Sequence, residues 1–498
     1  MSISRRDFIK TAGASALLLT AAQGIEWSRA QNVKEAKNDP TIHVANRLTW
    51  GAKPQDIAKI REMGVAAYID WQLEPAKIDD SKVEEYLAAE KIFAMSERQA
   101  HNEVREVGYG ETANKFYWGR IYRAIHSERQ LFEKLVEFWT DHFNVAINGL
   151  LPERIVYDRE AIRKHALGNF YDLLFATAKS SAMLIYLDNA KSKKQHPNEN
   201  YAREVMELHT LGVDGGYTEE DIANVAKAFT GWTLRDSWPG RFFFDQEAHD
   251  VTEKVVLGQK LAAGRGIEDG LQVLDLLANH KETAKYISKK LCKRFVSDDL
   301  DKALHESTTE VFISTNGNIK EVLRHILQSK QFLAAAGKKF RRPLELVVAA
   351  QRVTQPAFEI KNPNYVFNIL RPMEHMPFNW ATPDGYPDTA ESWISTNGML
   401  QRWNLAMVFT RAQGGRMEAI DLDYQKLLPF KEETVLELID RASVRILGGT
   451  LKDSDKEQVI YFLSDYGDAQ QAVDKNFWTE RLPMLVSLLV ASPYFQWS

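Results

Sequence analysis

Two glutamates with the spacing of an acid–base pair lie in the segment PNENYAREVMELHTLGVDGG, which begins at Pro197. Glu204 and Glu207 share one face if the segment is helical, and like charges at this spacing repel unless a cation, an arginine or a proton separates them. Such a pair can bind a metal ion or serve as general acid and base. The alternative is that Arg203 and its neighbours neutralise both carboxylates as structural ion pairs. The two glutamates are therefore candidate catalytic residues.

The surrounding sequence predicts a helix, a glycine-rich turn and a second helix that position this pair. Asn198 and Asn200 precede the first helix, where short polar side chains satisfy free backbone N–H groups. The helix is expected to stop near Gly212, and a capping sequence at Thr218 is expected to open the next helix. Because Asn198, Asn200 and Arg203 lie close to Glu204, they are candidate substrate-binding residues.

A third candidate catalytic residue, His142, lies on a predicted helix over 131–145. The large apolar residues of this segment recur at the helix period, and His142 falls on its aromatic side. One interpretation is a histidine satisfied within the core. The other is that His142 faces the same cavity as Glu204 and Glu207, with Asp141, Asn144 and Asn148 as polar surroundings.

The only predicted β-structure lies near 241–258. The stretches RFFFD (241–245) and EKVVLG (253–258) are short and β-prone, and a polar stretch separates them, which predicts one small hairpin. His249 and Asp250 lie in its connection. A His-Asp pair can bind metal or orient an imidazole for proton transfer, although adjacent strand residues point to opposite sides. We take both as candidate catalytic residues.

An irregular stretch over 373–403 is rich in proline, tryptophan, asparagine and aspartate. Aromatic side chains on such a stretch can form the wall of a binding site, since rings stack on sugar faces and line pockets. Trp380, Tyr386 and Trp393 are therefore candidate substrate-binding residues. The competing interpretation is a compact loop packed by its own aromatic side chains.

The remaining sequence predicts a mostly α-helical protein, a multi-helical globular array with one small hairpin. Segments from 267 to 332 and from 405 to 498 carry apolar residues at helix spacing, and a loop is expected at 412–416. No clean linker interrupts residues 31–498, so we expect one large domain, with a subdivision near 335–340 as the alternative.

The first 30 residues are predicted to be a twin-arginine signal peptide. Arg5 and Arg6 lie in the motif SRRDFIK, an apolar run follows over 12–22, and Ser28 and Ala30 suit cleavage before Gln31. The apolar run is shorter than the roughly 20 residues of a membrane-spanning helix, so no stable span is expected. The twin-arginine translocase is thus a predicted partner, and a periplasmic or secreted protein the predicted product.

Composition excludes several classes of site. The chain has 498 residues, a formal net charge of −5 and one cysteine, Cys292, so we expect no disulfide, iron–sulfur cluster or haem c. Mild acidity argues against a nucleic-acid partner. A glycine-rich phosphate loop, a GxSxG elbow and an HExxH helix are also absent from the sequence. A divalent cation held by oxygen and histidine ligands remains open.

Three motifs in order resemble the central signature of the bacterial domain-of-unknown-function family eighteen hundred: LIYLDNA (184–190), NENYAREVMELHTLG (198–212) and AFTGWTL (228–234). Further similar segments are NRLTWG (46–51), EFWTDHFNV (137–145), RKHALGNFYDLL (163–174), RRPLELVVA (341–349) and LLVASPYFQ (488–496). The His249-Asp250 pair also matches this pattern. The resemblance covers nearly the whole mature chain and implies no activity.

Two functional hypotheses follow. The first is an exported hydrolase or lyase that acts on a glycan or another cell-envelope or extracellular polymer, with Glu204 or Glu207 as acid or base, assisted by a histidine and by a divalent cation if one binds. The second is a non-catalytic envelope scaffold or polymer-binding protein. Convergence of Glu204, Glu207, His142 and His249 in one pocket would favour the first hypothesis, and dispersal with arginine partners the second.

Overall fold

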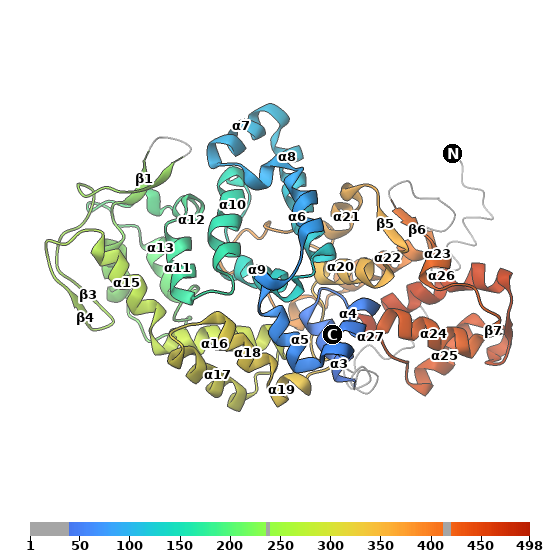
Figure 1. Ribbon diagram of the computed structural model, residues 1–498. Coiled ribbons are helices and arrows are strands. Elements are labelled where there is room, and N and C mark those ends of the chain that lie inside the picture. The colour runs from blue at the N-terminus through green and yellow to red at the C-terminus, as the bar shows by residue number, and fades with distance from the viewer. Residues whose placement is uncertain (1–38, 236–239, 412–419) are drawn as a thin grey trace.

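The computed structural model describes residues 39–235, 240–411 and 420–498 (Figure 1). The predicted twin-arginine motif, its cleavage site and the predicted loop at 412–416 lie outside the described residues. Helices dominate the described part, which confirms the mostly α-helical class.

The helices before residue 230 include the one that carries Glu204 and Glu207. They are α3 (Pro40–Leu48), α4 (Pro54–Met63), α5 (Val65–Gln72), η1 (Pro75–Lys77), α6 (Ser81–Ala88), η2 (Lys91–Ala94), α7 (Glu97–Val107), α8 (Tyr109–His126), α9 (Gln130–His142), α10 (Leu151–Tyr157), η3 (Asp158–Arg163), α11 (Phe170–Ala178), α12 (Ser181–Tyr186), η4 (Asn189–Lys191), α13 (Glu199–Glu207) and α14 (Glu219–Ala228). Among these, η3 is a π-helical continuation of α10.

The later helices follow the hairpins and run to the last residues of the chain. They are α15 (Glu268–Ala278), α16 (Lys281–Phe295), α17 (Lys302–Ser314), α18 (Ile319–Leu327), α19 (Lys330–Leu333), α20 (Pro343–Thr354), α21 (Pro363–Leu370), η5 (Ala390–Ser392), α22 (Thr396–Arg411), α23 (Tyr424–Leu427), α24 (Val435–Leu447), α25 (Asp453–Leu463), η7 (Asp465–Gly467), α26 (Lys475–Ala491) and α27 (Pro493–Gln496).

The predicted hairpin near 241–258 differs in its pairing. Both predicted strands exist, as β2 (Arg241–Phe244) and β3 (Lys254–Val256), but β2 pairs with β1 (Trp232–Arg235) and β3 pairs with β4 (Gln259–Leu261). Each of the two predicted strands thus pairs with the strand next to it in the sequence, across a short connection, and β2 and β3 do not pair with each other. Two more antiparallel pairs join β5 (Phe358–Ile360) to β6 (Ile420–Leu422) and β7 (Glu433–Thr434) to β8 (Ala472–Val473).

The predicted helix, glycine turn and helix is confirmed in α13 and α14. The side chain of Asn198 accepts a hydrogen bond from the N–H of Asn200 and caps α13. Gly212 takes a φ of +82°, a conformation that glycine adopts without steric cost. The capping box at Thr218 is complete, because the carboxylate of Asp221 accepts a hydrogen bond from the backbone N–H of Thr218.

Two apolar cores divide the molecule along its length. One is built from residues between Val44 and Ala335, including α9, α11 to α18 and the first two hairpins. The other joins parts of α7, α8 and α10 to residues between Leu344 and Phe495. Figure 1 places these groups at opposite ends, with the N-terminal helices between them. A small third cluster of Phe340, Tyr386 and Trp393 marks the place where the candidate site lies.

Candidate functional site

A cavity of about 140 Å³ lies where α9, α16, the start of α20 and residues 384–388 meet. We call it the Asp141 cavity. It combines three carboxylates and four cationic side chains in a small space, a composition suited to a polar ligand. Its lining residues are Phe138, Asp141, His142, Lys290, Lys293, Arg294, Arg342, Asp384, Tyr386 and Asp388.

The last turn of α9 and the residues just after it contact the irregular segment that closes this cavity. The side-chain amide of Asn144 donates to the carbonyl oxygens of Trp380 and Thr382, at 2.9 and 2.7 Å. Gly385 has a φ of +73° and packs so closely that an added Cβ would lie 2.0 Å from the carbonyl oxygen of Asp141. The backbone contact therefore places Asp384 and its neighbours against the end of α9.

Asp141 has the environment of a carboxyl group that titrates near neutral pH. Its Oδ2 atom accepts a hydrogen bond from Arg342 at 2.5 Å, and 14% of its side-chain surface remains exposed. Burial, reinforced by the charge of Glu137, raises the pKa of Asp141 to about 6 against the attraction of Arg342. The group can therefore exchange a proton under mild conditions.

Lys290 lies across the cavity as the matching cation. Burial lowers the pKa of Lys290 to about 8, although Asp141, Asp388 and Asp384 oppose the shift. Its Nζ donates to Nδ1 of His142 at 2.9 Å, and Nε2 of that ring donates to the carbonyl oxygen of His209 at 3.1 Å. Both nitrogens of His142 thus have protein partners.

The predicted role of His142 is refined by this arrangement. Burial first, and Lys290 next, hold the pKa of His142 well below its ordinary value, so its ring is neutral. The ring lines the Asp141 cavity, but Glu204 and Glu207 do not line it with His142, and the ring also packs among Phe138, Trp139 and Phe143, as the core interpretation expected. His142 is best described as a positioning residue that accepts a hydrogen bond from Lys290.

Buried ion pairs fix the arginines of the cavity. Glu345 lies 2.8 Å from Arg294 and 3.2 Å from Lys134, and Arg294 also contacts Asp388 at 3.0 Å. In contrast, the side-chain ammonium of Lys293 has no hydrogen bond or ion pair within the described residues, and Lys293 is only partly buried. Lys293 is therefore the cation of this cavity that is available to a ligand.

Glu204 and Glu207 lie beside the cavity rather than in its wall. Glu204 is half-buried, and burial together with the charges of Glu207 and Asp384 raises its pKa. Asp384 lines the Asp141 cavity, so the repulsion between Glu204 and Asp384 couples α13 electrostatically to that cavity. Glu207 accepts a hydrogen bond from Tyr217. Neither glutamate forms an ion pair with an arginine in the described part of the chain.

The polar residues near Glu204 have structural partners. Both guanidinium nitrogens of Arg203 bind Glu219, at 2.9 and 2.7 Å, so the expected Arg203–Glu207 pair is replaced by this contact with α14. The side-chain amides of Asn198 and Asn200 both reach the carbonyl oxygen of Leu187. These three side chains hold α13 in place, and none of them lines the Asp141 cavity.

His249 and Asp250 belong to a different region. His249 is completely buried, donates from Nδ1 to the carbonyl oxygen of Thr230 at 2.8 Å and lies 3.5 Å from Asp269. Asp250 accepts hydrogen bonds from Thr252 at 2.8 and 2.5 Å. Their partners come from the connections around the hairpins and from α15. The structure does not bring this pair together with Glu204, Glu207 or His142.

The aromatic segment is compact. Tyr386 is buried, donates to the carbonyl oxygen of Met376 at 2.8 Å and lines the cavity. The indole of Trp393 donates to Pro387 and its ring stacks on His375 with centroids 4.9 Å apart. Trp380 donates to Asp384 at 2.9 Å. The arrangement matches the compact-loop interpretation for Trp393, whereas Tyr386 also forms cavity wall.

Over residues 39–235, 240–411 and 420–498, no group of three or more histidine, cysteine, aspartate or glutamate side chains is placed to hold a metal ion. Within the same ranges, no helix has the length and apolarity needed to span a bilayer. Cys292 is buried beside Thr308 and its pKa is raised to about 11 by burial, consistent with a packing residue.

Sequence reasoning missed the cationic half of the site. Lys290, Lys293 and Arg294 are spaced three and four residues apart on α16, so they share one helix face. This spacing is visible in KKLCKRF but gives no indication that the face is turned inward. Arg342 stands before Pro343 at the start of α20, within one of the motifs of the family pattern.

The chain matches the model of a family described as protein of unknown function (DUF1800), over residues 43–497. The chain belongs to this family. The sequence resemblance is thereby confirmed across nearly all of the described residues. No curated protein and no solved structure matches the chain.

The shifted pKa of Lys290 predicts an unusual chemical reactivity. Acylation by a small amine-directed reagent is expected to follow a midpoint near pH 8, because only the neutral amine is nucleophilic and burial lowers the pKa of Lys290 to about 8. An ordinary lysine has a midpoint at about 10.4. Mass spectrometry of labelled peptides over a pH series measures the acylation midpoint of Lys290, with the exposed Lys302 as internal reference. A midpoint above pH 10 would contradict the described site.

Proposed function

We propose that the protein is an acid–base enzyme, a hydrolase or lyase, with the Asp141 cavity as its active site. The observation that carries the proposal is that the carboxylate of Asp141 and the ammonium of Lys290 open into the same cavity, beside the unpaired Lys293. Their pKa values of about 6 and about 8 support it, because at neutral pH one group is ready to accept a proton and the other to donate one.

The charge distribution indicates the substrate class. Lys293 is the available cation, whereas Arg294 and Arg342 are neutralised by buried carboxylates. A carboxylate on the substrate would pair with Lys293 and place the adjacent C–H or glycosidic or amide bond between Asp141 and Lys290. About 140 Å³ accommodates one small unit rather than a long segment, so a polymer would present one unit or its end. We therefore infer a carboxylate-bearing polymer, or fragments of one.

The neighbouring carboxylates have a supporting role in this proposal. Glu204 and Glu207 lie on the Asp384 side, where they would contact units outside the cavity. Export to the periplasm or the medium through the twin-arginine translocase rests on the N-terminal motif, and it agrees with a substrate in the cell envelope. Cell fractionation of a strain that carries Arg5→Lys and Arg6→Lys tests this part, since retention in the cytoplasm is the expected result.

The test of the activity uses mature protein and polymers with and without carboxylate-bearing units. New reducing ends or free amines would indicate hydrolysis, and ultraviolet absorbance of an unsaturated product would indicate elimination. Replacement of the acid or base is expected to lower kcat by about 10²- to 10⁴-fold, so Asp141→Asn and Lys290→Gln should both be nearly inactive. Lys293→Gln should raise KM with little change in kcat. Lys302→Gln, at an exposed site, is the matched control.

The pH profile gives a second readout. Activity should rise as Asp141 ionises near pH 6 and fall as Lys290 loses its proton near pH 8, which predicts a bell-shaped curve for kcat/KM. Binding without turnover, unaffected by Asp141→Asn, would overturn the enzyme proposal. It would favour the second hypothesis, a polymer-binding or scaffold protein, which the tight ion pairing of Arg294 and Arg342 supports.

A further inference from the structure

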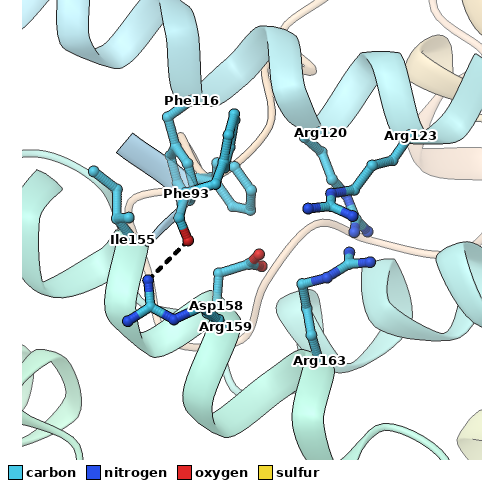
Figure 2. Close-up of a pocket in the computed structure, with 9 residues that line it drawn as sticks. Phe93, Phe116, Arg120, Arg123, Ile155, Asp158, Arg159 and Arg163 are labelled. Atoms are coloured by element: carbon cyan, nitrogen blue, oxygen red, sulfur yellow. Dashed lines mark hydrogen bonds between the residues drawn. The ribbon is translucent and has the colours of Figure 1, made fainter. Parts of the chain in front are cut away.

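A second polar cavity, of about 90 Å³, lies between α8 and η3 (Figure 2). Four of its lining side chains are arginines: Arg120, Arg123, Arg159 and Arg163. Figure 2 shows that Arg120 and Arg123 point down from α8 and that Arg163 points up from η3, so that their guanidinium groups converge. We call it the arginine cavity. It is separate from the Asp141 cavity, since the two share no lining residue.

Most of these arginines already have carboxylate partners. The pairs and their shortest N–O distances are Arg120 with Glu137 at 2.6 Å, Arg163 with Glu133 at 2.5 Å and Arg159 with Glu160 at 2.7 Å. Arg123 is the exception, because its side chain has no hydrogen bond or ion pair within the described residues and lies 5.9 Å over the ring of Phe93. The charge of Arg123 is therefore balanced only at a distance, by Glu133 and Asp158, and its N–H groups have no acceptor in the described residues.

Two further polar atoms at this cavity have ion-pair neighbours but no hydrogen bond. Arg120 is 4% exposed, and its Nη1 atom lies 3.7 Å from Glu133 without a hydrogen-bond acceptor in the described part of the chain. Asp158 is 8% exposed, and its Oδ1 atom lies 3.9 Å from Arg154 without a hydrogen-bond donor there. Figure 2 shows the carboxylate of Asp158 directed toward the guanidinium groups. Buried polar groups without partners are costly, so a ligand that offers both an acceptor and a donor would satisfy them.

The local backbone and the electrostatics agree with a ligand site. Asp158, Arg159 and Arg163 all come from the π-helical turn η3, and such turns occur frequently at functional sites. Burial, reinforced by the like charges of Arg163 and Arg120, lowers the pKa of Arg123 to about 10 against the attraction of Glu133 and Asp158. The free protein thus carries a repulsion that a bound anion would relieve.

From this geometry we propose that the arginine cavity is a binding site for hydrogen phosphate. Arg123 and the free N–H of Arg120 donate to the oxygens of the anion, and the P–OH group donates to Oδ1 of Asp158. Inorganic phosphate keeps at least one proton at neutral pH, whereas sulfate has none to donate to the carboxylate. The volume suits one small oxyanion and is far below the roughly 300–1,000 Å³ of pockets for drug-sized ligands, such as a nucleotide would need.

The test is calorimetric titration of the mature protein with inorganic phosphate and with sulfate at equal ionic strength. Phosphate is expected to bind saturably and at least about 10-fold more tightly than sulfate, because sulfate leaves a buried carboxylate oxygen unpaired. Arg123→Gln should weaken phosphate binding by about 10-fold or more. Asp158→Asn should bring the two affinities close together. Arg98→Gln, at an exposed position on α7, is the matched control and should change neither.

Folding of the variants can be judged separately from binding. Because the guanidinium group of Arg123 has no hydrogen bond, and burial with the repulsion of Arg163 and Arg120 outweighs the attraction of Glu133 and Asp158, Arg123→Gln should have an apparent melting temperature equal to or above that of the unaltered protein without phosphate. Phosphate should then raise the melting temperature of the unaltered protein but not of the variant. No saturable phosphate binding, equal binding of sulfate, or an unchanged affinity in Arg123→Gln would each overturn the proposal.

Discussion

Replacing Glu137 with glutamine is expected to lower the free energy of unfolding by about 3–5 kcal/mol, the cost of removing one partner from a buried ion pair. Oε2 of Glu137 accepts from Nε and Nη2 of Arg120 at 3.0 and 2.6 Å, and Oε1 lies 3.5 Å from Arg342. The substitution keeps the volume but leaves two buried guanidinium groups short of a negative charge. Both candidate cavities depend on this carboxylate, because Arg120 lines one and Arg342 lines the other.

Urea denaturation of the unaltered protein and the variant measures the loss. The matched control is Glu219→Gln, which also removes a carboxylate from a two-point contact with an arginine, Arg203, but at the exposed surface. Little change is expected for this control, since exposed ion pairs add little stability. An equal loss in the two variants would contradict the importance of burial.

The pH dependence gives a second readout for Glu137. Burial alone would raise its pKa, but Arg120, Arg342 and His375 together lower it below the ordinary value. A carboxyl group with a depressed folded pKa contributes stability that is fully present above its unfolded pKa, about 4.3 for glutamate. That contribution is lost as the pH falls through the folded value. The difference in stability between the unaltered protein and Glu137→Gln should therefore shrink as the pH falls below about 4.3.

Local signals were sufficient to predict most of the helical architecture. The caps at Asn198 and Thr218 and the glycine turn at Gly212 depend on residues only a few positions apart, and the structure has them as expected. The prediction that residues 241–245 pair with residues 253–258 was wrong, because β-propensity identifies strands but not the strands with which they pair. Trp232–Arg235, the true partner of β2, precedes it by only five residues, and the Pro239-Gly240 dipeptide between them is a turn signal that the prediction did not use.

The site was predicted only in part, because its chemistry depends on contacts over long sequence distances. His142 was identified from its helix face and does line the Asp141 cavity. Lys290 is 148 positions away from His142, and Arg342 is 201 positions away from Asp141. No local pattern carries such a pairing. His249 and Asp250 show the converse, since two adjacent polar residues suggest joint chemistry, but buried neighbours such as Thr230 and Asp269 satisfy the histidine separately.

A single methyl group at Gly385 is expected to dislodge the segment that closes the Asp141 cavity. In Gly385→Ala the new Cβ would lie 2.0 Å from the carbonyl oxygen of Asp141 and 2.9 Å from its Cα. These are backbone atoms of α9, so no side-chain rotation relieves the overlap. Overpacking costs about 1–3 kcal/mol or more, in addition to roughly 1–2 kcal/mol for a left-handed conformation at a φ of +73°.

The matched control for this substitution is Gly149→Ala. Gly149 has a φ of +75°, and nothing lies within 4 Å of its added Cβ, so only the backbone term of roughly 1–2 kcal/mol is expected. The difference between the two variants in urea denaturation isolates the packing of residues 384–388 against α9. Equal destabilisation would contradict this close contact.

Displacement of the segment should also be visible in the reactivity of Lys290. Burial is the largest cause of its lowered pKa, while Asp141, Asp388 and Asp384 raise it. Moving residues 384–388 away admits water but also removes two of those carboxylates, and the loss of burial is the larger effect. The acylation midpoint of Lys290 should therefore move upward from about 8 in Gly385→Ala and stay in place in Gly149→Ala. A midpoint unchanged in both variants would mean that the cavity keeps its shape without this contact.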